Sequence, residues 1–249
     1  MSATAAHTPP VVVTGAAGDI GQAVVRRLQA DGRQVIGSDL CPRPAALGDL
    51  TWHRTDLAGA EGWAALADAI EGPLSGFVHV AGIVLTQSID EITEADWDRC
   101  FAVHVKAPFF MTRALSGRLE AGASVVLVGT VAARRASPEN LVYGATKAAL
   151  ASMAASLSVS FATRGVRINV VAPGLIDTQL THATTQKLSA LRGTTPEATA
   201  KARVAGIPMG RAGEPDEVAG AVAWLLSRDS SYVTGTTIMV GGGLLAGSV

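Results

Sequence analysis

Residues 11–21 read VVVTGAAGDIG, and this stretch carries the strongest structural signal in the chain. The apolar run 11–14 leads directly into a turn with three glycines, and residues 22–30 then read as a helix. Strand, glycine turn and helix in this order are typical of a dinucleotide-binding fingerprint, because glycines let backbone N–H groups approach a pyrophosphate and a helix N-terminus favours its negative charge. The sequence therefore predicts cofactor-binding residues here, with an ordinary loop as the alternative: Gly15, Gly18, Asp19, Ile20 and Gly21.

A carboxylate ends the next apolar run. Residues 34–39 finish in Asp39, where a carboxylate suits the ribose hydroxyls of an adenosine and repels a 2′-phosphate. We therefore expect NAD rather than NADP, although a merely solvated Asp39 is the alternative. Arg43 follows closely and is a candidate for binding a 2′-phosphate, but Ala16 and Ala17 provide no basic side chain in the turn.

Tyr143 and Lys147 are four residues apart at the start of a long helical run. This spacing places both side chains on one face of a helix. A phenol has a pKa of about 10, and a neighbouring ammonium group lowers it. The pair is therefore a candidate proton-transfer device, with an ordinary surface pair as the alternative.

Composition excludes several classes of protein. Hydrophobic residues make up 48% of the 249 residues and charged residues 16%, which excludes a disordered chain. The net charge of −1 gives no electrostatic footprint for nucleic acid or an anionic membrane. Cys41 and Cys100 have no metal-ligand spacing, so we expect free thiols, no metal and a reducing compartment. Without a signal-peptide pattern or a long apolar stretch, a cytoplasmic protein is expected.

Strand-like and helix-like runs alternate along the chain, which predicts an α/β fold with a doubly wound parallel sheet. We expect a flexible tail over residues 1–10 and one Rossmann-like domain over 11–249. Residues 178–208 break the alternation except for a helix near 196–205, and are interpreted as a substrate lid or, alternatively, a surface excursion. Strands are expected at 11–14, 34–39, 51–55, 76–81, 124–130, 167–171 and 236–240, and helices at 20–30, 63–70, 94–118, 141–163 and 215–226.

From Val11 to Leu244 the chain resembles the short-chain dehydrogenase/reductase family, in particular 3-oxoacyl-carrier-protein reductases and secondary-alcohol dehydrogenases. The glycine turn matches the family's glycine motif, and Tyr143-x-x-x-Lys147 matches its catalytic motif. Thr130 stands where the family places a catalytic Ser. Further family positions that contact the cofactor fall on Asp56, Leu57, Ala81, Gly82, Pro173, Gly174, Ile176 and Thr178.

The resemblance implies an NAD(P)-dependent oxidoreductase that interconverts a secondary alcohol and a ketone. Tyr143 is then the general acid/base, Lys147 lowers its pKa and holds the nicotinamide ribose, and Thr130 orients the substrate oxygen. The resemblance also implies a homotetramer built on the helices expected at 94–118 and 141–163 and on the C-terminal strand.

The chain departs from the family pattern at four places. Asp19 stands beside the expected pyrophosphate, and we expect its carboxylate to cap the helix that follows. His79 and Val80 replace two family asparagines, and Thr130 replaces Ser. His104 stands where the family has a catalytic Asn, and a proton relay to Lys147 and a packed core histidine are equally good interpretations. These departures leave two alternative functions open, an NADPH-dependent carbonyl reductase and a catalytically degenerate dinucleotide-binding protein.

The lid sequence gives limited information on the substrate. Apolar lid residues with little fixed charge nearby suggest a mostly apolar molecule: Leu180, Leu188, Leu191 and Val204. Arg134 and Arg135 are candidates for contact with an anionic tail, but a solvated surface pair is the interpretation that we favour.

Overall fold

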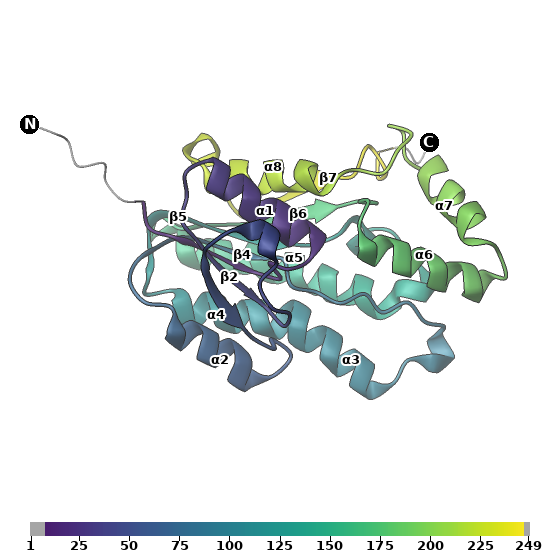
Figure 1. Ribbon diagram of the computed structural model, residues 1–249, viewed down its shortest axis with the longest axis horizontal. Helices are drawn as coiled ribbons and strands as arrows, with labels where there is room; N and C mark the ends of the chain where they lie inside the picture. Colours follow the sequence, from purple (N-terminus) through teal and green to yellow (C-terminus); the bar gives the residue numbers. More distant parts are fainter. Residues whose placement is uncertain (1–7, 247–249) are drawn as a thin grey trace, which may run out of the picture.

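The computed structural model describes residues 8–246, which form one seven-stranded parallel sheet in the order β3-β2-β1-β4-β5-β6-β7 (Figure 1). Residues 1–7 lie outside the described part, and so does most of the tail expected over 1–10. Pro9 is anchored, since its carbonyl accepts a hydrogen bond from Ser75 Oγ at 2.6 Å. The strands are β1 Val11–Thr14, β2 Val35–Asp39, β3 Thr51–Arg54, β4 Leu74–His79, β5 Leu119–Val128, β6 Arg167–Pro173 and β7 Thr237–Val240.

The central strands are buried on both faces and are rich in apolar side chains. All four residues of β1 are buried and all seven of β6 are buried, the pattern expected where helices cover both sides of a parallel sheet. Strand order reverses between β1 and β4, so the chain leaves a crevice at the carboxyl ends of these two strands. The predicted fold class is confirmed.

Helices cover the sheet in two layers (Figure 1). α1 (Asp19–Ala30) and α8 (Pro215–Leu226) pack on one face around an apolar cluster that includes Leu28 and Val222. α2 (Ala60–Ala69), α4 (Ala107–Leu115) and α5 (Leu141–Ala162) pack on the other around Phe77. No helix in residues 8–246 combines the length and apolar character that a membrane span requires.

The single helix expected at 94–118 is interrupted. α3 (Glu94–Phe101) is followed by a π-helical turn, Ala102–Lys106, before α4 begins. The N–H of Ala107 donates to the carbonyl of Ala102, five residues earlier, instead of four. Pro108 explains the change, because proline has no N–H to donate to the carbonyl four residues before it, and its ring would clash with that carbonyl.

Two helices fill the segment 178–208. α7 (Pro196–Ala205) was expected, whereas α6 (Gln179–Arg192) was missed. Thr178 starts α6 by accepting a hydrogen bond from the Thr181 N–H at 3.1 Å. Together α6 and α7 form a unit, called the cover below, beside the carboxyl ends of the strands at the right of Figure 1.

Candidate active site

A cavity of about 420 Å³ lies at the carboxyl ends of the strands. Its walls come from the segments after β4, β5 and β6, from the start of α5 and from the cover. Because these segments follow neighbouring strands, the sheet brings together residues that are far apart in the sequence. The predicted site residues that line the cavity are Ile20, Gly82, Thr130, Tyr143, Lys147, Pro173, Gly174, Ile176 and Thr178.

The glycine turn between β1 and α1 forms a cradle that side chains would fill. Gly15 has φ +71°, and a Cβ atom there would lie 2.3 Å from the N atom of Ala81. A Cβ atom on Gly21 would lie 2.0 Å from the carbonyl oxygen of Gly15. Gly18 occupies the N-cap of α1 and has no side chain to bond the first N–H groups of the helix. These groups therefore fit a phosphate approaching the helix N-terminus.

Asp39 lies beside this turn. Its Oδ2 accepts a hydrogen bond from the Ala17 N–H at 3.0 Å, and its Oδ1 accepts one from the Cys41 N–H at 3.0 Å. The carboxylate is thus fixed at the end of β2, next to the cradle, where a ribose hydroxyl can donate to it. The cradle and this carboxylate fit a dinucleotide cofactor.

Asp19 has a different role from the one expected. Its Oδ2 accepts a hydrogen bond from the N–H of Gln179 at 2.7 Å, and no side-chain cap is present on α1. The prediction that Asp19 caps α1 is therefore wrong, because the carboxylate bonds the first residue of α6 instead. This hydrogen bond joins the glycine turn, called the cofactor turn below, to the cover, although the two residues are 160 positions apart in the sequence.

Tyr143, Thr130 and Lys147 meet on the sheet side of the cavity. Lys147 is buried, and its Nζ donates to the carbonyl oxygen of Val128 at 2.7 Å and lies 5.9 Å from the centre of the Tyr143 ring. The hydroxyl of Thr130 accepts a hydrogen bond from the Ala132 N–H at 3.2 Å. Two hydroxyls and one ammonium group therefore border one space, which suits the binding and protonation of a carbonyl oxygen.

Burial shifts the pKa values of both Tyr143 and Lys147. Desolvation raises the pKa of Tyr143 to about 12, while a hydrogen bond with Thr130 acts in the opposite direction. Desolvation lowers the pKa of Lys147 to about 8. The expected lowering of the Tyr143 pKa by Lys147 is therefore wrong, because burial dominates. Tyr143 is a neutral phenol that can donate a proton.

His104 is fully buried behind Tyr143, with 5.6 Å between the ring centres. Its Nε2 accepts a hydrogen bond from the Ile83 N–H at 3.0 Å, so its Nδ1 carries the proton and donates to Thr146 Oγ1 at 2.8 Å. The Thr146 hydroxyl in turn donates to the carbonyl oxygen of Tyr143 at 2.8 Å. Both ring nitrogens are therefore engaged, and burial lowers the pKa of His104 to about 2. The geometry favours a packed, neutral histidine over a proton relay.

His79 is a second neutral histidine, with the opposite tautomer. Its Nε2 lies 3.1 Å from the carbonyl oxygen of Val103, which can only accept, so Nε2 is protonated and Nδ1 accepts from Thr14 Oγ1 at 2.9 Å. Burial lowers the pKa of His79 to about 3. His79 thereby joins the end of β1 to the π-helical turn that carries His104.

The cover differs from the sequence interpretation. Leu180 and Leu188 line the cavity as expected, whereas Leu191 and Val204 are not among the described lining residues. The expectation of little fixed charge is wrong, because Arg192 and Arg203 of the cover line the cavity together with Arg135 and Glu139. The sequence pattern of residues 178–208 does not indicate that Arg203 lines the cavity, because the direction of its side chain depends on how α7 packs on α6.

The remaining predicted residues lie elsewhere. Asp56 bonds its own turn, accepting from the Ala58 N–H at 2.9 Å, and Leu57 is buried in the apolar core. Arg43, the candidate partner of a 2′-phosphate, lies 3.9 Å from Asp49.

Comparisons with known proteins agree with this geometry. A family model described as enoyl-(acyl carrier protein) reductase matches residues 15–245. An acetoacetyl-CoA reductase of Synechocystis is 37% identical over 238 residues, covering 93% of this chain and 94% of that protein. A solved short chain dehydrogenase family protein of Francisella tularensis has a TM-score of 0.89 at 30% identity, covering 96% of this chain and 99% of the other. The angucycline C-6 ketoreductase LanV, solved with bound NADP, has a TM-score of 0.83 at 27% identity, covering 97% of each chain. The chain belongs to the short-chain dehydrogenase/reductase family, NAD(P)-dependent oxidoreductases that act on CH–OH groups.

Proposed function

We propose that this enzyme prefers NAD and interconverts a secondary alcohol and a ketone, with Tyr143 as general acid/base. The observation that carries the proposal is the convergence of Tyr143, Thr130 and Lys147 on one cavity beside the glycine cradle. The nicotinamide, when bound, supplies or accepts the hydride. The protein's residues position the substrate and move the proton.

Each polar group has a distinct part in this chemistry. Tyr143, a neutral phenol, donates its proton to the carbonyl oxygen during reduction and accepts it back during oxidation. Thr130 orients the same oxygen through its hydroxyl. Lys147 holds the nicotinamide ribose and places a positive charge near the phenol. Pro173, Gly174, Ile176 and Thr178 border the nicotinamide.

The NAD preference rests on Asp39, whose fixed carboxylate accepts from ribose hydroxyls and repels a 2′-phosphate. An NADPH-dependent carbonyl reductase is the second candidate. It is favoured by Arg54, whose Cα is in register with that of Asp39 and whose Nε donates to the Leu40 carbonyl at 2.9 Å. The increase in melting temperature with NAD, compared with the increase with NADP, distinguishes the NAD-preferring enzyme from the NADPH-dependent reductase. We expect Asp39→Ala to weaken the binding of NAD and to narrow the difference in affinity between NAD and NADP. Glu120→Ala, which removes an exposed carboxylate near the start of β5, should leave the binding of both cofactors unchanged.

Turnover decides between an enzyme and a degenerate binding protein. A panel of secondary alcohols with NAD, followed by nicotinamide absorbance, is expected to give turnover that needs Tyr143. NAD binding without turnover of any panel member, and of any matching ketone with NADH, would favour the degenerate protein.

Assembly, location and lid movement are parts of the same proposal. A cytoplasmic homotetramer is supported by Val159, which is 75% exposed on α5, and by the free thiols of Cys41 and Cys100. Light scattering tests the tetramer. The cover acts as a substrate lid over residues 178–208 of the single domain, joined to the cofactor turn through Asp19.

A further inference from the structure

The cavity has an excess of positive charge. Its charged lining residues in the described part of the chain are Lys147, Arg135, Arg192 and Arg203 against one carboxylate, Glu139. Glu139 is already paired, because its Oε1 lies 2.7 Å from Arg192 Nη2. The chain as a whole has a net charge of −1, so the excess is local. Since Lys147 serves the catalytic end, two arginines remain without an anion.

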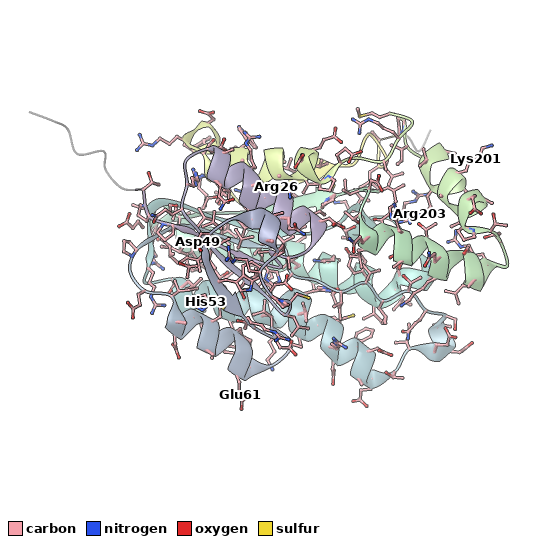
Figure 2. The ribbon with its side chains drawn as sticks, viewed as in Figure 1. Arg26, Asp49, His53, Glu61, Lys201 and Arg203 are labelled. Carbon is pink, nitrogen blue, oxygen red and sulfur yellow. The ribbon has the colours of Figure 1, made fainter. Side chains whose placement is uncertain are left out.

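Arg203 is the more buried of the two. Figure 2 shows Arg203 on the side of α7 that faces α6, whereas Lys201 lies on the outer side. Its Nη1 donates to the carbonyl oxygen of Thr181 at 3.3 Å and to the hydroxyl of Thr185, both in α6. No carboxylate in residues 8–246 lies within ion-pair distance of Arg203. A partly buried guanidinium with only neutral acceptors is costly unless an anion completes its bonding.

Arg135 lines the same cavity from the segment after β5. It follows Thr130 by five residues, and its Nη1 lies 3.9 Å from the position that a Cβ atom would take on Gly206. The carbonyl oxygen of Arg203 lies 3.9 Å from that same position. Arg135 therefore reaches the end of α7, and within the described residues its side chain has no hydrogen bond or ion pair.

We propose that the substrate is an oxo acid or its hydroxy acid, whose carboxylate binds between Arg203 and Arg135 while its carbonyl or hydroxyl group lies at Tyr143. A carboxylate matches the planar pair of N–H groups on a guanidinium. It is also small enough for a cavity of about 420 Å³ that the nicotinamide shares. Leu180 and Leu188 border the carbon chain between the two ends. This inference rests on the proposed function and replaces a mostly apolar substrate with an acidic one.

The test compares acids with their methyl esters. The probes are 4-oxopentanoate, 5-oxohexanoate and 6-oxoheptanoate, each beside its methyl ester, with NADH and with NADPH. We expect at least one acid to exceed its ester in kcat/KM by about tenfold to a hundredfold, the value of a charge-assisted hydrogen bond. Arg203→Met is expected to remove that advantage by lowering kcat/KM for the acid to about that of its ester.

Two further variants keep the result interpretable. Lys201→Met removes a positive charge from the outer side of the same helix. It should leave kcat/KM unchanged for both the acid and the ester. Arg135→Met removes the second cation without removing a hydrogen bond in the described residues, and should lower kcat/KM for the acid alone. If Arg203→Met weakens folding, Arg135→Met still tests the proposal.

Binding supplies a readout that does not need turnover. Calorimetric titration of the acids into the enzyme with NAD should show about tenfold weaker binding in Arg203→Met and wild-type binding in Lys201→Met. Esters that are turned over as well as acids would overturn the carboxylate site and leave the proposed function standing. Acids that bind through Arg203 without turnover would support the site and count against the proposed function. Equal kcat/KM for acid and ester, together with unchanged binding of the acids in Arg203→Met, would overturn the inference.

Discussion

The two walls of the cavity are held in place by different means. On the sheet side, Tyr143 and Lys147 extend from α5 over buried strands, and His104 and His79 fix the backbone behind them through hydrogen bonds at both ring nitrogens. On the cover side, α7 buries one of its ten residues, Thr199. Proton transfer requires groups held within a narrow geometry, whereas substrate selection tolerates movement. Changes on the sheet side should therefore alter kcat, and changes on the cover should alter KM.

The largest effect is expected on the sheet side, from Tyr143→Phe. Removing the hydroxyl removes the proposed proton donor, so kcat should fall by about a hundredfold to ten-thousandfold while the dinucleotide still binds. Tyr232→Phe is the matched control, because the only other tyrosine is fully exposed. Turnover of Tyr143→Phe within a few-fold of wild type would contradict the assigned role.

Substitutions of His104 test how much the rigidity of the sheet side depends on this one imidazole ring. His104→Ala leaves the Ile83 N–H and the Thr146 hydroxyl without their partner, so the free energy of unfolding should fall by about 2–4 kcal/mol. His104→Asn restores one acceptor and one donor and should recover part of the loss. Chemical denaturation measures both.

The relay interpretation of His104 is tested by the pH dependence of kcat. With packing alone, His104→Ala keeps the profile of wild type under conditions where both are folded. A shift of the pH–kcat profile in His104→Ala that is reversed in His104→Asn would support the relay interpretation instead.

The same two histidines predict a pH dependence of stability. In the folded protein the pKa values of His79 and His104 are about 3 and about 2, against about 6.5 in the unfolded chain. Below pH 6.5 the unfolded chain binds more protons, so the stability present above that pH is lost as the pH falls, by up to about 1.4 kcal/mol per pH unit for each histidine. Denaturation at pH 7, 6 and 5 should show this slope, and His104→Asn should roughly halve it. An unchanged slope in that variant would contradict the assignment.

The smallest effect is expected on the cover. Asp19→Asn weakens the hydrogen bond from the Gln179 N–H that joins α6 to the cofactor turn. We expect KM for substrate to rise about twofold to fivefold with kcat unchanged, the value of one exposed hydrogen bond. Asp31→Asn, at the other end of α1, is the control. A fall in kcat without a change in KM would contradict the expectation that the cover affects KM and the sheet side affects kcat.

Sequence predicted the sheet side far better than the cover. β1 and the Tyr143–Lys147 pair were located correctly because apolar runs and helical spacing are local signals. The partner of Asp19 lies 160 residues away, and the direction of Arg203 depends on the packing of α7, so neither leaves a local pattern. The histidine tautomers likewise depend on hydrogen-bond partners from three segments.

The π-helical turn at Ala102–Lys106 has a consequence for the length of the chain. One more residue than an α-helix needs is present there, and each helical residue turns the backbone by about 100°. Deleting one residue from the turn would rotate one side of the helix by about 100° relative to the other and move the Val103 carbonyl away from His79.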